Sequence, residues 1–401
     1  MTAQQPGDVA LAIDVGGTKM AACLVGPDGT ATDHGGTATI MSGSSEAATP
    51  AGRDPDAAER VWAPLAGLVE EVLRAVGDRR LIGVGIGSAG PIDPVAATVS
   101  PVNIPAWRDF PLVDRLAALV PGVPVRLAGD GHCAAAGEHW MGAGRGADDL
   151  LVLVVSTGVG GGLIQGGRLV AGPSGNAGHI GHMIVDLDGD PCPCGGRGCV
   201  EAIASGPSMV SWALRNGWCA PRPPAGLLAP RDSRPDDGHG HADRRDSATG
   251  GTGTGAPDGS VADGRSHLRD GARLGGAEVD RRPTAVDLAA SARAGDPVAR
   301  QAFVRAGRAV AAGVVSAAAL GDLSRVVVGG GVAQSADLLM PPLRSAIAEY
   351  GRLGFLRRLT VEPAALGVTA GLVGAAALIF VPDLYAGRGV ATRVPHRVST
   401  G

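Results

Sequence analysis

Aromatic residues are scarce in this chain: they make up 3% of its 401 residues, while hydrophobic residues make up 45%. A core with so few rings must be built mainly from Ala, Val and Leu. The sequence is long enough for two domains of ordinary size. Its 65 glycines indicate many turns and close approaches of the backbone, which suit loops that wrap around a ligand.

A strongly basic stripe is also missing, since the formal net charge is -4 and the pI is about 6.1. The electrostatics therefore give no support for nucleic-acid binding. The opening residues, MTAQQPGDVA, lack the charged start and the apolar block of a secretory signal. We therefore expect a cytoplasmic protein, in which the six cysteines remain reduced thiols.

One uncharged run, residues 364–381 (AALGVTAGLVGAAALIFV), needs to be considered as a membrane span. Its eighteen residues barely reach the length that crosses a bilayer. The run is rich in Ala and Gly, which is more typical of a buried helix in a water-soluble fold. We therefore expect no membrane association.

Strand-like and helical patterns alternate along the chain, which is typical of the α/β class. Short apolar runs predict strands at residues 10–15, 20–25, 81–86, 123–127, 150–155 and 326–328. Helical spacing predicts one helix over residues 56–76, a second that ends near residue 120, and a third at 133–140. Two or three further helices are predicted after residue 284. No internal repeat of short period is evident.

Residues 220–283 differ from the rest of the chain. They are rich in Gly, Pro, Asp, Arg and Ser, include GTGTGAPDGS, and have almost no apolar periodicity. This composition predicts a disordered insertion.

Three glycine-rich loops follow predicted strands, and such loops can expose backbone N–H groups to a phosphate. The first contains Asp14, Gly16, Gly17, Thr18 and Lys19, the second Thr157, Gly158 and Gly160, and the third Gly329, Gly330 and Gly331. Asp14 is a candidate ligand for hydrated Mg²⁺. One such loop also occurs as an ordinary hairpin turn, but three indicate a nucleotide held between two lobes. No Walker A sequence is present, nor a dinucleotide fingerprint in its expected context.

Four potential metal ligands lie close together in the sequence: His182, Cys192, Cys194 and Cys199. Thiolates and imidazole are zinc ligands, and three cysteines with one histidine complete a closed tetrahedral site. A closed set predicts a structural zinc that organises a loop, without Lewis-acid catalysis. The alternative is a few buried thiols and a core histidine, which cysteines clustered among glycines and prolines make less favourable.

The chain resembles the ROK family of sugar kinases and sugar-responsive repressors. The resemblance rests on four motifs in matching order and spacing: D-x-G-G-T-K, S-T-G-V-G-G-G, G-H-I-G-H and C-x-C-G-x-x-G-C-x-E. The resemblance covers nearly all of the chain except residues 220–283 and the last dozen or so. It implies an actin-like, ribonuclease-H-like fold of two lobes, with ATP and a sugar in the cleft. The expected N-terminal lobe is 1–128 with a helix at about 368–385. The expected C-terminal lobe is 129–367 with a zinc loop at 179–201, followed by a flexible tail at 386–401.

The resemblance also implies roles for single residues. Asp130, in GDGHCAAAGE, matches the catalytic base, which accepts the proton of a sugar hydroxyl as it attacks the γ-phosphate. An Asp at this place is also a common helix N-cap. Gly129 departs from the family, which usually has an Asn that touches the sugar. Asn103 and Glu201 match sugar-binding residues, and His182 matches a histidine that binds zinc through one nitrogen and presents the other to the sugar.

His179 indicates the substrate. Glucokinases of the family usually have Glu here, whereas the histidine in AGHIGH resembles bacterial N-acetylmannosamine kinases, which also share the CVEAIASG segment. A neutral imidazole suits an N-acyl group at the second carbon of the sugar. The less favoured alternative is that the residue is a neutral change in a broad hexokinase. We expect transfer from ATP with Mg²⁺ to the 6-hydroxyl of a hexose or N-acylhexosamine. N-acetylmannosamine is the first choice, glucose the second, and polyphosphate an alternative donor.

A non-catalytic sugar sensor or transcriptional regulator is the alternative from a different class. Family regulators carry a helix-turn-helix ahead of the D-x-G-G-T segment, and thirteen residues precede Asp14 here. A sensor also has no need for a general base at Asp130. We therefore expect a kinase whose partner is a small-molecule sugar, without nucleic acid, and which assembles as a homodimer or homotetramer.

Overall fold

The computed structural model describes residues 5, 7–16, 19–31, 36–39, 55–220 and 282–395. These residues belong to one compact unit formed by Met1–Ala220 with Pro283–Gly401, apart from Arg282 at its border. The insertion predicted over residues 220–283 lies outside the described residues except at its two ends.

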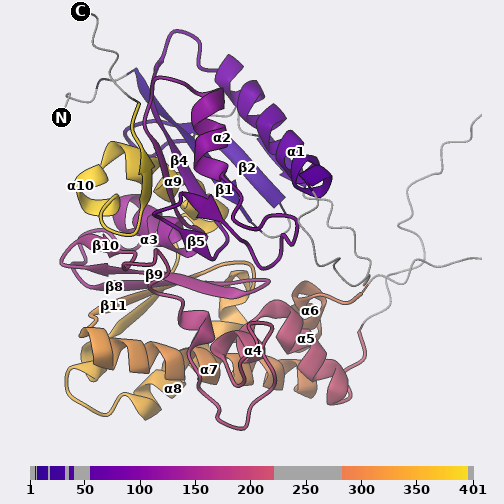
Figure 1. The fold of residues 1–401 in the computed structure, drawn as a ribbon. Helices are drawn as coiled ribbons and strands as arrows, with labels where there is room; N and C mark the ends of the chain where they lie inside the picture. The colour runs from indigo at the N-terminus through magenta and orange to yellow at the C-terminus, as the bar shows by residue number, and fades with distance from the viewer. Residues whose placement is uncertain are drawn as a thin grey trace, which may run out of the picture. The chain divides into compact units, whose positions relative to one another are not determined.

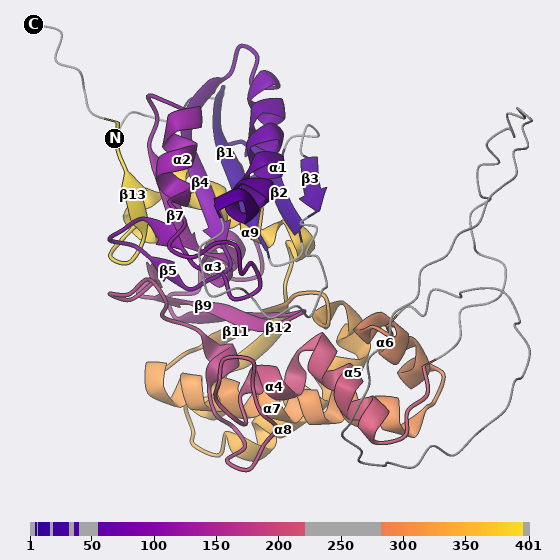
Figure 2. The ribbon, with the colours of Figure 1, turned by 45° about the vertical axis from the view of Figure 1, so that its right-hand side comes forward.

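A six-stranded sheet has the order β13-β7-β4-β1-β2-β3. Its strands are β1 (Asp8–Val15), β2 (Lys19–Val25), β3 (Gly36–Thr39), β4 (Arg80–Ser88), β7 (Val125–Gly129) and β13 (Ala391–Arg393). β1, β2 and β3 pair antiparallel in succession, and β4 and β7 add in parallel on the other side of β1. Figure 2 shows β13 and β3 at opposite edges of this sheet.

A five-stranded sheet has the order β10-β9-β8-β11-β12. Its strands are β8 (Leu150–Val155), β9 (Val159–Gln165), β10 (Arg168–Val170), β11 (Arg325–Gly329) and β12 (Thr360–Pro363). Again three successive strands pair antiparallel, and two later strands add in parallel beside the first. The same topology therefore occurs twice, which confirms the predicted α/β, two-lobed, actin-like and ribonuclease-H-like fold.

The helices are α1 (Pro55–Arg74), α2 (Leu112–Leu119), α3 (Asp130–Met141), α4 (Val200–Ala204), α5 (Gly206–Arg215), α6 (Ala285–Arg293), α7 (Pro297–Gly321), α8 (Ala336–Tyr350), α9 (Ala370–Phe380) and α10 (Pro382–Tyr385). A small sheet pairs β5 (Ile92–Asp93) with β6 (Thr98–Val99). Figure 1 shows α1 and α2 on one face of the six-stranded sheet. The helices α5 to α8 pack against the five-stranded sheet in a separate apolar core.

Alternation along β1 explains how the six-stranded sheet is covered. Leu11, Ile13 and Val15 pack into the core shared with α1 and α2, whereas Ala10 and Ala12 face the opposite side and pack with α3 and α9. The core around α3 and α9 also takes side chains from β8 and β11, so these two helices lie between the two sheets. The helix carrying Asp130 is thereby held from both sides.

Close packing around α9 explains several glycines. A Cβ on Gly85 of β4 would collide with the backbone of Ala375 in α9, and a Cβ on Gly374 would collide with the carbonyl of Cys133 in α3. Only glycine fits at these two positions, because the backbone of α9 is in direct contact with the backbones of β4 and α3 there. The residues of the apolar run at 370–380 are mostly buried, as expected for a core helix.

The flexible tail predicted over residues 386–401 is wrong for residues 391–393. They form β13, which pairs antiparallel with β7, and Ala391 is fully buried. Hydrogen bonds to a distant strand order this short segment, and its own sequence gives no alternating pattern. Residues 396–401 lie outside the described residues.

Within the part of the chain that the structure describes, one helix, α7, is long and apolar enough to cross a membrane by length and composition. Half of its most apolar window is buried inside the fold, and its buried side chains pack with α4, α5, α6 and α8. We therefore interpret α7 as the central helix of a core.

Candidate functional site

Two aspartates lie at the same end of the six-stranded sheet. Asp14, near the end of β1, is in register with Gly87 of β4. Asp130 begins α3 directly after β7, whose last residue, Gly129, is in register with Ser88 of β4. Because β1, β4 and β7 are parallel, their carboxyl ends meet at one edge, where ligands bind in open α/β sheets.

The surroundings of these aspartates raise both pKa values. The Asp130 side chain is open to solvent, yet the protein around it removes enough water to raise the pKa of its carboxyl group, against a 2.7 Å hydrogen bond donated by the Gly131 N–H. Burial and then the charge of Asp130 raise the pKa of Asp14 to about 6, which Lys19 opposes. A ligand can therefore reach a carboxylate with an increased affinity for protons.

The loop after β4 joins the segments that carry Asn103 and His179. The Gly90 carbonyl accepts a hydrogen bond of 3.2 Å from the N–H of Val102, the residue before Asn103. Asn103 itself is exposed. The Asn176 side chain binds both backbone groups of Ile92, at 3.2 Å and 3.1 Å. A Cβ on Gly90 would lie 3.8 Å from Cε1 of His179. These contacts bring the two predicted sugar-binding segments to one loop.

His179, His182 and Glu201 form a second group beside this loop. The rings of His179 and His182 stack with their centroids 6.0 Å apart and their planes at 12°. Glu201 accepts a hydrogen bond of 2.8 Å from the Val159 N–H, which holds its carboxylate at the turn between β8 and β9. Partial burial and the neighbouring His182 lower the pKa of His179, while Glu201 opposes the shift. His179 is therefore a neutral hydrogen-bonding group at neutral pH.

The predicted zinc ligands converge. One ligand atom from each of His182, Cys192, Cys194 and Cys199 lies within 4.8 Å of the others. Cys194 Sγ and Cys199 Sγ are 3.8 Å apart, and Cys192 Sγ is 3.9 Å from Nδ1 of His182. Thiolate ligands around a tetrahedral zinc are about 3.8 Å apart, so this donor set fits zinc. With Nδ1 facing the thiols, Nε2 of His182 remains available to another partner.

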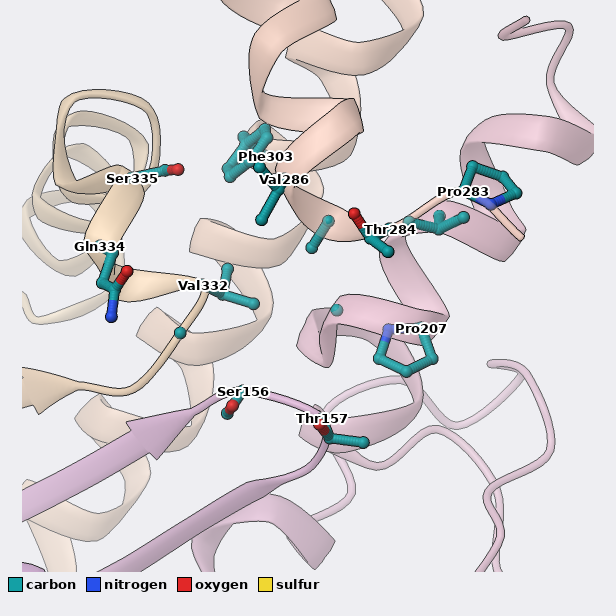
Figure 3. Close-up of a pocket in the computed structure, with 14 residues that line it drawn as sticks. Ser156, Thr157, Pro207, Pro283, Thr284, Val286, Phe303, Val332, Gln334 and Ser335 are labelled. Atoms are coloured by element: carbon teal, nitrogen blue, oxygen red, sulfur yellow. The ribbon is translucent and has the colours of Figure 1, made fainter. Parts of the chain in front are cut away.

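A cavity of about 390 Å³ opens where the β8–β9 turn meets the loop after β11 (Figure 3). Ser156 and Thr157 come from the turn, Gly331 and Val332 from the loop, and Phe303 from α7. The remaining lining residues are Gly206, Pro207, Val210, Pro283, Thr284, Ala285, Val286, Gln334 and Ser335. Apolar walls with a few hydroxyl and amide groups suit a flat ring with polar edges.

The glycine loops contribute unequally to this cavity. Thr157 and Gly331 line it, and Gly330 turns the chain with a φ of +95°, where a side chain would be strained. Three other glycines predicted to bind ATP lie in or beside the neighbouring strands: Gly158, Gly160 and Gly329.

The first glycine loop lies at the six-stranded sheet, beside Asp14. Gly16 donates its N–H to the Lys19 carbonyl at 3.0 Å, which closes the turn between β1 and β2. Gly17 and Thr18 lie outside the described residues. Asp14 and Lys19 are near enough for their charges to interact.

Sequence reasoning assigned no role to Glu138, Asn176 or His132. The Glu138 side chain is fully buried and accepts three backbone hydrogen bonds, at 2.8, 3.1 and 2.8 Å, from the loops after α3 and before α9. A carboxylate directly after the run CAAAG of α3 was the available signal for Glu138. Asn176 binds backbone groups of the distant Ile92 and of the nearby Ser174, and a single sequence carries no signal for the distant partner.

The chain belongs to the ROK family, whose family model matches residues 10–232 and 259–380. The gap between the two matched segments, residues 233–258, lies within the insertion predicted over residues 220–283. A glucokinase of Streptomyces coelicolor is 30% identical over 378 residues, covering 93% of this chain and 98% of the relative. An N-acetylmannosamine kinase of Escherichia coli (strain ATCC 8739) is 41% identical over 204 residues, covering 51% of this chain and 63% of the relative.

A solved structure supports the same relationship. A ROK family glucokinase from Streptomyces griseus, in complex with glucose and AMPPNP, superposes with a TM-score of 0.64 at 28% sequence identity. The match covers 92% of this chain and 99% of that protein.

Proposed function

We propose that this protein is a sugar kinase that transfers the γ-phosphate of ATP, with Mg²⁺, to the 6-hydroxyl of a hexose or N-acylhexosamine. The observation that carries the proposal is the carboxylate of Asp130, which is open to solvent, has a raised pKa and lies beside Asp14 at the end of the sheet. Whole-chain similarity to a glucokinase supports it.

In the proposed reaction, Asp130 accepts the proton of the sugar hydroxyl as the oxygen attacks the γ-phosphate. Asp14 contributes to the binding of hydrated Mg²⁺, and the first glycine loop lies beside the phosphates. The cavity between Thr157 and Gly331 takes the adenosine part of ATP. The lowered pKa of His179 keeps its imidazole neutral, so that it exchanges single hydrogen bonds with the sugar.

The zinc ligands have a supporting role in this proposal. His182, Cys192, Cys194 and Cys199 would hold Zn²⁺, whose bonds fix the imidazole of His182 in one orientation. Nε2 of His182 then faces the sugar, and Asn103 and Glu201 bind further hydroxyls. Because all four positions are taken by protein ligands, the site is structural.

N-acetylmannosamine is the proposed substrate, on the grounds that His179 stands where glucokinases usually have Glu. Identity of 41% to an N-acetylmannosamine kinase over about half of this chain also favours it. Glucose is the second candidate, because similarity to the glucokinase extends over 93% of the chain. Polyphosphate is the alternative donor.

A coupled ADP-release assay tests the proposal, with Mg²⁺-ATP against N-acetylmannosamine, N-acetylglucosamine, glucose, mannose and fructose. A clear preference for N-acetylmannosamine is expected. A preference for glucose would be consistent with a sugar kinase but would show that His179 does not select N-acetylmannosamine. Sugar binding without turnover would favour a sensor.

We further propose that the kinase acts in the cytoplasm as a homodimer or homotetramer. Light scattering on the purified protein measures the assembly directly.

A further inference from the structure

His132 is a buried histidine on the first turn of α3, two residues after Asp130. Its side chain is 2% exposed. Its Nε2 lies 2.6 Å from the carbonyl oxygen of Ala177. A carbonyl only accepts hydrogen bonds, so Nε2 carries the proton and donates it. This bond joins the turn that carries Asp130 to the segment that leads into His179.

The other ring nitrogen of His132 has no hydrogen-bond partner among the described residues, although it is buried. An unpaired buried acceptor destabilises a fold and calls for an explanation. The ring is held by the hydrogen bond from Nε2 to the Ala177 carbonyl, and in this orientation Nδ1 is the unprotonated nitrogen that stays unpaired. Burial lowers the pKa of His132, and the neighbouring His179 adds to the effect.

Position 129 makes room for this ring. Gly129 has φ -62° and ψ 151°, angles open to any residue, so its backbone does not require glycine. A Cβ there would lie 3.0 Å from Nδ1 of His132. The imidazole therefore takes up the space into which a side chain at position 129 would extend.

Glycines also bring the neighbouring segments together around β9. A Cβ on Gly131 would collide with the carbonyl of Gly161 in β9. Gly178 has a φ of +81°, and a Cβ on it would lie 3.2 Å from Cα of Gly162. The start of α3 and the segment before His179 thus both pack on the same part of β9, and the His132 bond links them directly.

We propose that His132 is a positioning residue that sets His179 relative to Asp130, and that Gly129 is the matching small residue that permits it. This inference rests on the proposed function, because it gives the pair Asp130 and His179 a common substrate. His132 itself need not touch the sugar.

The test compares three variants of the full-length protein. His132→Leu removes the donor at similar size, and His132→Gln restores a donor that can reach Ala177. His139→Leu is the matched control, because His139 lies on the same helix and bonds Tyr385 and Ala147 away from the site. We expect His132→Leu to lower kcat/KM for the sugar on the order of 10²-fold, with KM for ATP unchanged. His132→Gln should recover most of it.

A double-mutant cycle tests the pairing with position 129. Gly129→Ala should impair sugar turnover in the wild-type background and have little further effect beside His132→Ala, because the clash is then gone. Additive effects, or equal effects of His132→Leu and His139→Leu on sugar kinetics, would overturn the proposal.

Hydrogen exchange provides a readout that needs no turnover. His132→Leu should speed exchange in peptides over residues 176–182, and His139→Leu should not. If the wild-type protein phosphorylates no sugar, the proposed function fails while this measurement still decides whether His132 fixes the segment. Unchanged exchange in His132→Leu would refute the positioning role on its own.

Discussion

Asp14 and Asp130 lie at the carboxyl ends of β1 and β7, the two parallel strands that flank β4, and the charge of Asp130 raises the pKa of Asp14. Two neighbouring carboxylates that repel each other are a disadvantage for folding. The same pair is suited to bind a cation and to accept a proton, so stability and proposed activity make opposite demands here.

Asp14→Asn should therefore stabilise the protein at pH 7.5 by up to about 3 kcal/mol while abolishing turnover. The pKa of Asp14 is about 6 in the folded protein, above its ordinary value of 3.8. The folded state therefore binds the proton more tightly and loses stability as the pH rises through this window. The gain should shrink as the pH falls from 6 towards 4. Urea denaturation across this range measures it, with Asp78→Asn at an exposed turn as the control. A pH-independent loss of stability would contradict the prediction.

Cys194→Ser should lose the bound metal and raise KM for the sugar about tenfold, because His182 is no longer fixed. KM for ATP should change little, since the cavity at Thr157 is separate from the ligand cluster. Metal analysis of the purified protein, together with sugar kinetics, provides the measurement. Cys219→Ser is the matched control, as Cys219 is also exposed and lies outside the cluster. Full activity in metal-free protein would show that sugar turnover does not depend on the metal.

Glu138→Leu should destabilise the fold by about 3 kcal/mol or more, because three backbone N–H groups lose their buried acceptor. Glu138→Gln keeps one side-chain carbonyl oxygen and should cost less. Urea denaturation of both variants gives the comparison. Equal effects of Leu and Gln would mean that packing matters at this position and the hydrogen bonds do not.

His179→Glu should shift sugar preference from N-acetylmannosamine towards glucose by about 10- to 100-fold in the ratio of kcat/KM values. A carboxylate accepts hydrogen bonds from neighbouring hydroxyls, whereas a neutral imidazole exchanges one at each nitrogen. Competition between the two sugars in one reaction measures the ratio. Proportional loss for both sugars would show that position 179 does not select the substrate.

Local patterns predicted much of the fold. Apolar runs ending in glycine identified β1, β8 and β11, and helical spacing identified α1 and α7. The short strand β13 was missed because pairing with β7, far away in the sequence, orders it. The repeated sheet topology was likewise invisible as a repeat, since the two sheets share strand order and not sequence.

The candidate site divides in the same way. Residues that present side chains to a ligand lie in motifs, and sequence reasoning selected the cysteine cluster and Asp130. Residues that hold the backbone in place, such as Asn176, Glu138 and His132, bind carbonyl and N–H groups of distant segments. Only the folded chain reveals these partners, since any residue supplies such groups.

The most direct test of the central claim is to identify the product. Wild-type protein and Asp130→Asn are each mixed with Mg²⁺-ATP and N-acetylmannosamine or glucose, and the sugar phosphate is quantified by NMR. We expect the wild type to form a 6-phosphate and the variant to lose about 10²- to 10⁴-fold in rate, with its sugar affinity largely retained. A fully active Asp130→Asn, or a wild-type protein that forms no sugar phosphate, would contradict the claim.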